Sequence, residues 1–291
     1  MEIGNLFKPK EPETPAEKFL AIQIQEGILK TAVWQVINGH PEIINFGTVE
    51  KWIDTESLVT ATDTSLSSAL ESQTSEPDQV IFGLPDSWIK EDKINPEYGH
   101  HLKELIAKLE LKPIGFVAII EATIQQLKNR EGIPPSAIFL EIHSTKVNVV
   151  VVKLGETVGK EEVGRSDDLA KDVQEGLARL NINQLPARII IIDGQEPDVE
   201  QQLTSFPWQD DLSFLHLPKV ELPDPNFSIE AVALSGGSEA AKSLGIEIVD
   251  PELTKQPSPP ENTEEQPDFS SDNNLGFITG QDIRKVNHPQ N

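Results

Sequence analysis

The feature that most constrains this chain is a pattern of strands and helices that occurs twice. Each half begins with a β-hairpin, continues with a third strand and a helix, and then reaches a strongly apolar strand. In the first half the predicted elements are strands at 19–25, 28–37 and 42–49, a helix at 55–71 and a strand at 79–84. In the second half they are strands at 137–142, 146–153 and 157–163, a helix from the N-cap Ser166 through Leu180, and a strand at 188–193. This order predicts an α/β protein built from two similar modules.

Further helices complete the two modules. Apolar residues at i, i+3, i+4 and i+7 from Leu102 to Leu109 predict an amphipathic helix at 100–109. The remaining predicted elements are a strand at 114–120, a helix at 121–131 that ends at Gly132, a short helix at 197–206 and a final helix at 228–244. We therefore expect a first module at 17–135 and a second at 136–248.

Two segments have two interpretations each. Residues 207–224 hold Trp208 and other apolar residues beside proline and acid. They form either a buried edge strand, which we favour, or an exposed binding edge. The run SGGS at 235–238 either contacts a phosphate through its backbone or marks a helix break or a close packing contact, and we favour the latter.

The two ends of the chain do not have the composition of a packed core. Residues 1–16 are polar and rich in proline, and residues 249–291 combine proline with Glu, Gln, Ser, Asp and Asn. We expect both segments to be disordered, because such sequences bury too little apolar area to fold. One apolar motif, LGFITGQDI at Leu275–Ile283, is either a docking peptide for a partner or a weakly structured remnant.

Charge and residue types exclude several kinds of chemistry. The chain has 24 Lys and Arg against 48 Asp and Glu, a net charge of -24, and no cysteine. Nucleic acids and anionic membranes attract clustered positive charge, so neither is expected as a direct partner. Disulfides, thiolate metal sites and cysteine nucleophiles are excluded. The sequence has neither the apolar core of a signal peptide nor a run of about 18 apolar residues that would span a bilayer, which predicts a cytoplasmic protein.

Four stretches of the chain carry a family resemblance. Ala21–Val33 is similar to the hairpin sequence GIDIGSSSIKAV, and Phe82–Pro85 to a strand that ends in LP. Leu109–Leu127 resembles a helix-strand-helix segment with an acidic residue, here Glu121, and Glu141–Gly155 is similar to DIGxxxTxLxVVxxG. These stretches resemble the actin-like ATPase superfamily, in the branch of the cell-division protein FtsA and the type IV pilus protein PilM. The resemblance implies two ribonuclease-H-like modules over about residues 18–245.

The chain departs from the family at both hairpin turns. Gln23 and Gln25 stand where the family has Asp and Gly in the first turn, and Glu141 and His143 stand there in the second. The family glycines let backbone N–H groups approach phosphate, and the aspartates hold hydrated Mg²⁺ or orient the attacking water. Glutamine has no charge to offer a cation, and the larger side chains crowd the approach. We therefore expect no catalytic residue, no metal ligand and no cofactor.

The resemblance also assigns contacts in case nucleotide binding survives. The residues that would contact ATP and Mg²⁺ are Lys30, Glu141, Ser144, Thr145 and Gly194. Purely structural roles are open as well, because Lys30 is a strand lysine and Gly194 follows a buried strand. Glu121 is a carboxylate at a helix N-terminus, where the helix dipole stabilises it.

Three hypotheses for function follow. The first is a degenerate, non-catalytic scaffold of the FtsA/PilM-like type, which links cytoplasmic components to a membrane-associated division or pilus-type apparatus through protein partners. The second is a divergent ATPase of the same fold, and the third is an interaction domain with an unrelated partner. The extra subdomain of the family is missing, because only about 30 residues follow Asp86 before the connecting helix. We expect no polymerisation surface that depends on it.

Overall fold

The computed structural model describes residues 17–71, 73, 76–193, 198–209, 212–214, 216–243 and 245. Gly194, the Leu275–Ile283 motif and the two segments predicted to be disordered lie outside this part of the chain.

The first sheet has the strand order β3-β2-β1-β5-β8. Its strands are β1 (Lys18–Gln25), β2 (Ile28–Ile37), β3 (His40–Phe46), β5 (Gln79–Leu84) and β8 (Lys112–Ala118), and the short β4 (Glu50–Lys51) pairs with β2. The β1–β2 and β2–β3 pairs are antiparallel, whereas β5 runs parallel to both β1 and β8. The hairpin, the third strand and the apolar strand are therefore those predicted from the sequence.

The second sheet repeats this topology in the order β11-β10-β9-β12-β13. Its strands are β9 (Ala137–Ile142), β10 (Lys146–Lys153), β11 (Glu156–Gly164), β12 (Arg188–Ile192) and β13 (Lys219–Glu221). Again the first three strands are antiparallel and the last two are parallel additions. The predicted α/β fold with two similar modules is confirmed, and the segment 207–224 contains an edge strand, β13, beside the buried Trp208.

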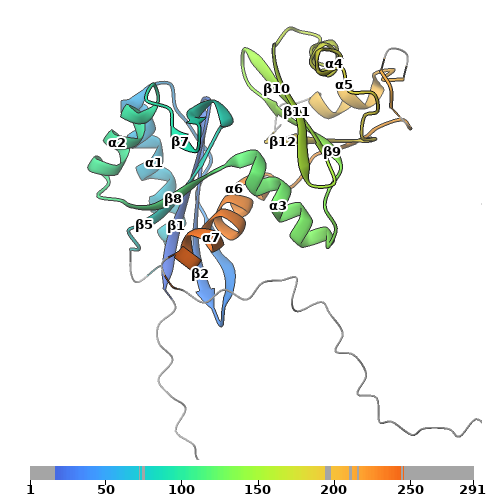
Figure 1. Ribbon diagram of the computed structural model, residues 1–291. Helices are drawn as coiled ribbons and strands as arrows, with labels where there is room; N and C mark the ends of the chain where they lie inside the picture. The colour runs from blue at the N-terminus through green and yellow to red at the C-terminus, as the bar shows by residue number, and fades with distance from the viewer. Residues whose placement is uncertain are drawn as a thin grey trace, which may run out of the picture. The chain divides into compact units, whose positions relative to one another are not determined.

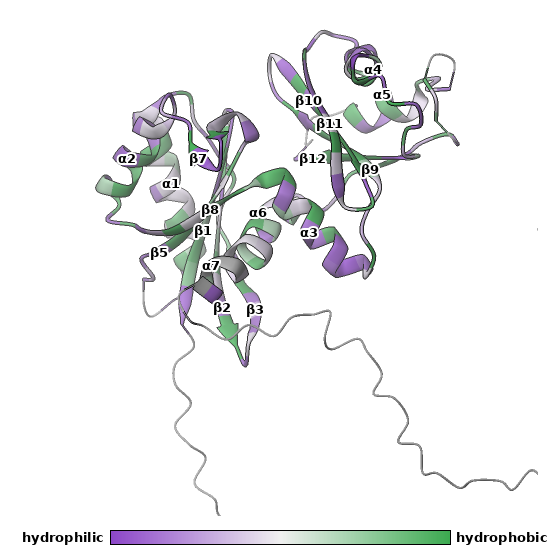
Figure 2. Cartoon of the chain, in the orientation of Figure 1, coloured by the Kyte–Doolittle hydropathy of each residue, from purple (hydrophilic) through white to green (hydrophobic). Residues whose placement is uncertain are grey.

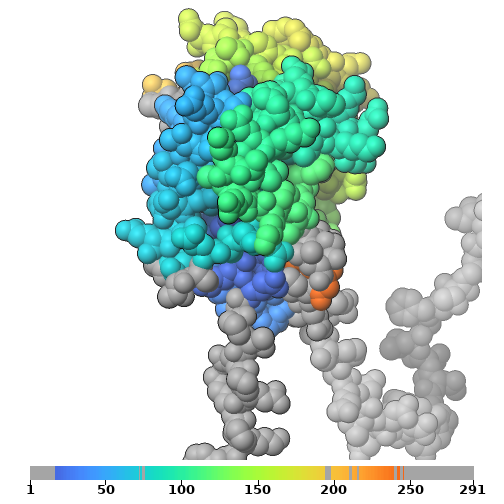
Figure 3. Space-filling view, turned by 90° about the vertical axis from the view of Figure 1, so that its left-hand side faces the viewer, coloured from blue at the N-terminus to red at the C-terminus, as the bar shows by residue number. Residues whose placement is uncertain are grey.

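One face of each sheet is covered by helices that follow in the same half of the chain (Figure 1). Helices α1 (Thr55–Leu70) and α2 (Gly99–Lys108) cover the first sheet, where Leu58 and Leu105 pack with Leu20 and Ile22 of β1. The space-filling view shows residues of this first module forming the surface on that side (Figure 3). Helices α4 (Leu169–Leu180) and α5 (Val199–Ser205) cover the second sheet in the same way. Apolar side chains that alternate along each strand supply these two cores.

A third core contains residues from both sheets. It joins Phe19, Ala21 and Trp34 of the first sheet to Phe139 and Ile190 of the second. The helical segments α3 (Ile119–Glu131), α6 (Phe227–Ala231), the π-helix η2 (Val232–Gly236) and α7 (Gly237–Ser243) contribute to this core. Figure 2 shows α3 largely apolar in its first turns, which contribute to this core, and hydrophilic toward its C-terminal end.

The last helical segments pack against the first sheet, although they follow the second sheet in the chain. A Cβ atom on Gly83 of β5 would lie 2.4 Å from Cγ2 of Val232, and one on Gly237 would lie 2.5 Å from Cζ2 of Trp34. Within 235–238, Gly236 and Gly237 therefore allow close packing, and a π-helical turn replaces the single continuous helix predicted for 228–244.

The predicted N-cap Ser166 is wrong. Asp168 occupies the N-cap of α4, and its side chain accepts a hydrogen bond from the backbone N–H of Lys171 at 3.3 Å. Ser166 instead donates its backbone N–H and its hydroxyl to the carboxylate of Asp172, at 2.6 and 2.8 Å. The sequence offers two capping residue types two positions apart, and local pattern does not choose between them.

The close contact at Gly83 leads to a stability prediction. Gly83→Ala should lower the free energy of unfolding by about 1–3 kcal/mol, because the new methyl group forces Val232 to move within a packed core. Urea unfolding of the purified protein measures this. Gly164→Ala is the matched control, since a Cβ at this strand glycine meets no atom within 4 Å, and its effect should stay within about 0.5 kcal/mol. Equal effects of the two substitutions would show that the contact is unimportant.

Candidate functional site

The first hairpin places two polar side chains on the face of its sheet that carries the shared core. Gln23 and Lys30 are direct partners across the β1–β2 pair. Side chains alternate along a strand, so Gln23 lies on the same face as Phe19 and Ala21. Both polar residues are buried, with relative exposures of 1% for Gln23 and 2% for Lys30. Buried polar groups need partners, and a buried ammonium above all.

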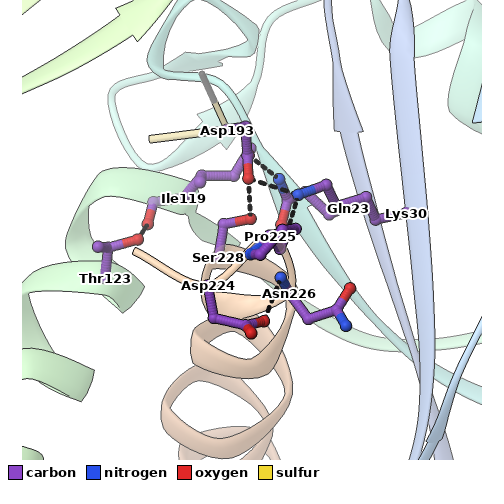
Figure 4. A network of polar contacts seen from close by, with 9 residues as sticks. All are labelled: Gln23, Lys30, Ile119, Thr123, Asp193, Asp224, Pro225, Asn226 and Ser228. Carbon is purple, nitrogen blue, oxygen red and sulfur yellow. Dashed lines mark hydrogen bonds and ion pairs between the residues drawn. The ribbon is translucent and has the colours of Figure 1, made fainter. Parts of the chain in front are cut away.

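Asp193 supplies those partners. It follows β12 directly and accepts hydrogen bonds from Lys30 Nζ at 2.5 Å, from Gln23 Nε2 at 2.8 Å and from the hydroxyl of Ser228 at 2.8 Å (Figure 4). Lys30 Nζ also donates to the backbone oxygen of Pro225. The side chains of Lys30 and Asp193 are 3% and 6% exposed, so the ion pair is shielded from water. A charge-assisted contact of this kind is stronger than a hydrogen bond between neutral groups.

The segment before α6 fixes the geometry around this pair. The carboxylate of Asp224 accepts the backbone N–H of Asn226 at 2.8 Å, which orders the turn that carries the oxygen of Pro225 (Figure 4). Asp193 itself has a φ of +57°, in the left-handed region that few residues other than glycine adopt. Aspartate tolerates this conformation better than most residues, but it is held here by its contacts.

The second hairpin has its own buried acid. Glu141 on β9 is paired with Asn148 on β10, whose side-chain amide donates to Glu141 Oε2 at 3.1 Å and lies 3.3 Å from His143 Nε2. Burial raises the pKa of Glu141 to about 7; the hydrogen bond from Asn148 lowers the pKa, and the nearby carboxylates of Asp86 and Asp193 raise it. At neutral pH this side chain is therefore a mixture of acid and carboxylate.

Two buried oxygen atoms remain without a partner among the described residues. They are Oε1 of Gln23 and Oε1 of Glu141, one in each hairpin. Around them, Lys160 pairs with Asp86, and Lys146 Nζ lies 3.8 Å from Glu26 Oε2. Each of these outer ion pairs joins a residue of the first module to a residue of β10 or β11.

The other residues assigned by resemblance lie elsewhere or face other groups. Ser144 lines a cavity of about 520 Å³ on the second module with Arg165 and Gln202 among its other residues. The backbone oxygen of Thr145 accepts the backbone N–H of Arg165 at 2.9 Å. Glu121 lies in the first turn of α3, in line with a structural role. Sequence reasoning missed Asp193 and Ser228; the one signal was a charged residue at the end of the apolar run RIIIID.

The charged groups of this site already have partners or are absent. The ammonium of Lys30 is already paired with Asp193, and Gln23 has no charge to attract a hydrated cation. In the described residues no group of three His, Cys, Asp or Glu side chains is placed to hold a metal ion.

No helix in this part of the chain is long and apolar enough to cross a membrane.

Comparison with solved structures establishes the fold. The ethanolamine utilization protein EutJ from Carboxydothermus hydrogenoformans superposes with a TM-score of 0.50 and 11% identity, over 76% of this chain and 90% of that one. PilM in the PilM–PilN type IV pilus biogenesis complex gives a TM-score of 0.50 and 11% identity, over 78% and 97%. A Bacteroides thetaiotaomicron protein of unknown function with an actin-like ATPase fold gives 0.48 and 11%, over 75% and 95%.

This protein therefore has the actin-like ATPase fold, with PilM among its structural neighbours, as the resemblance implied. No family model matches the chain, and none of the curated proteins matches it. At 11% identity the likeness describes the fold alone.

The raised pKa of Glu141 predicts how stability depends on pH. The folded protein binds the Glu141 proton more tightly than the unfolded chain does, so this residue stabilises the fold below about pH 4.5. That contribution falls as the pH rises to about 7, and the total loss is on the order of 3 kcal/mol. Glu141→Gln should therefore be more stable than wild type at pH 8, with the difference vanishing near pH 4.

Chemical unfolding at pH 4, 6 and 8 checks this prediction. Glu156→Gln is the control, because it replaces an exposed carboxylate on β11 in the same way. A Glu141→Gln protein that tracks wild type at every pH would contradict the assignment.

Proposed function

We propose that this protein is a non-catalytic scaffold of the FtsA/PilM-like type. In this role it is cytoplasmic and links other components to a membrane-associated division or pilus-type apparatus through protein contacts. The observation that carries the proposal is the state of the two hairpins. Gln23 is neutral, Glu141 is partly protonated at neutral pH, and Lys30 is paired with Asp193. A site for hydrated Mg²⁺ and a triphosphate requires free charge at these positions.

A protein partner is supported by two further points. The structural neighbour PilM was solved in complex with PilN, and the net charge of -24 disfavours direct contact with an anionic membrane. Membrane association in this proposal therefore comes from the partner. The motif at Leu275–Ile283 is the segment we propose as the docking peptide.

A divergent ATPase is the second candidate function. The observation that favours it is the pair of unpartnered buried oxygens, Oε1 of Gln23 and Oε1 of Glu141, which face no donor in the described residues. In that case Lys30, Glu141, Ser144, Thr145 and Gly194 are the residues proposed to contact ATP and Mg²⁺. Lys30 would have to leave Asp193 to do so.

Titration calorimetry with ATP and ADP, with and without Mg²⁺, separates the two candidates. The scaffold proposal expects no binding heat at millimolar nucleotide and no release of phosphate. Hydrolysis that requires Mg²⁺ and is lost in Glu141→Ala, with Glu156→Ala as the matched control, would overturn it and establish the ATPase.

Pull-down from the source organism tests the docking motif. The full-length protein should recover division or pilus components, and Phe277→Ser together with Ile278→Ser should reduce that recovery about tenfold or more, because apolar anchors carry most of the energy of a short docking peptide. Phe269→Ser is the control, since it removes an aromatic residue of the same segment outside the motif. Undiminished recovery by the double variant would reject the motif, and recovery of unrelated proteins alone would reject the apparatus.

A further inference from the structure

The carboxylate of Asp193 lies in a receptor that has the composition of an oxyanion site. One ammonium, one amide N–H and one hydroxyl converge on its two oxygens, at 2.5 Å for Lys30, 2.8 Å for Gln23 and 2.8 Å for Ser228. Charged and neutral donors that converge in a shielded place are what binds a small anion. These donors come from β1, β2 and α6, so the receptor is formed by the fold and not by a single loop (Figure 4).

The carboxylate that these three donors bind, that of Asp193, belongs to the other module. Gln23 and Lys30 belong to the first hairpin, whereas Asp193 ends β12 of the second sheet. The backbone of Asp193 has a φ of +57°, which is unfavourable for a residue with a side chain. A strained backbone persists when its surroundings hold it, and here the three donors to the carboxylate do so.

We propose that Asp193 is an internal ligand. Its carboxylate occupies a preformed oxyanion site and joins the two modules, and its removal leaves a site that binds inorganic phosphate or acetate. The inference goes beyond the scaffold role. It does not rest on a protein partner, because it concerns only the contacts of Asp193 within this chain. Its test uses small anions alone, so it is separate from the measurement of nucleotide binding.

Asp193→Gly is the variant that tests it. Glycine removes the carboxylate and suits the positive φ at this position, so the backbone is retained. We expect the melting temperature of Asp193→Gly to fall below that of wild type, and inorganic phosphate or acetate to restore most of the loss. The anions should act on the variant at a concentration about tenfold or more below any that affects wild type. Sodium chloride of matched ionic strength controls for general salt effects.

Two further variants keep the result specific. Adding Lys30→Met to Asp193→Gly removes the cation of the receptor and should abolish the rescue. Asp193→Asn keeps the site filled with a neutral group, so it should lose stability without responding to phosphate. If Asp193→Gly does not fold in chloride, the yield on refolding in acetate against chloride gives the same comparison.

The outcomes are decisive in either direction. Rescue of Asp193→Gly that is absent from wild type, from Asp193→Asn and from the double variant supports the internal ligand. Equal anion effects on all four proteins, or no effect on Asp193→Gly whether it is measured by melting or by refolding yield, overturns it. Nucleotide calorimetry on wild type is a separate measurement, so failure here is distinguishable from failure of the scaffold proposal.

Discussion

A lysine that is buried to this degree must be neutralised, and in this protein its counterion comes from the other half of the chain. Lys30 and Asp193 are 163 positions apart in sequence, yet they form an ion pair with side-chain exposures of 3% and 6%. The cost of burying two charges is recovered when the geometry is good and the remaining hydrogen-bonding capacity is used. Here the carboxylate also accepts hydrogen bonds from Gln23 and Ser228, and the ammonium also donates to the backbone oxygen of Pro225. The arrangement of the first hairpin, the end of β12 and the start of α6 therefore depends on this one pair.

The internal repeat explains why the two hairpins can be compared directly. Gln23 and Glu141 occupy the same place in their modules, near the end of the first strand, and each is paired with a residue of the second strand. Each also keeps one buried oxygen without a donor among the described residues. The two modules differ in how the burial is compensated. In the first, an amide and an ammonium face a carboxylate, and in the second a carboxylic acid retains part of its proton.

The sequence was sufficient for what depends on local periodicity, and insufficient for what depends on distant contacts. Strands β1, β2 and β5 were predictable because apolar residues recur with the period of a strand or form a continuous buried run. The N-cap of α4 was not, because Ser166 and Asp168 both have the chemistry of a cap. The role of Asp193 was also hidden, since nothing near it in sequence identifies Lys30 or Ser228 as its partners. The packing of residues 227–243 on the first sheet was hidden for the same reason. It depends on contacts between residues far apart in sequence, namely Gly83 with Val232 and Gly237 with Trp34.

The π-helical turn at Val232–Gly236 has a consequence for how this chain tolerates insertions and deletions. A π turn holds one residue more than the α-helical turn it replaces, so a deletion there shortens the segment by one residue without breaking it. Because one full turn then holds one residue fewer, the residues that follow keep nearly the same angular position. Gly237 would still face Trp34, and no side chain would take its place against the indole. The wide turn therefore absorbs a difference of one residue locally, and α7 can present the same side to the sheet with or without it.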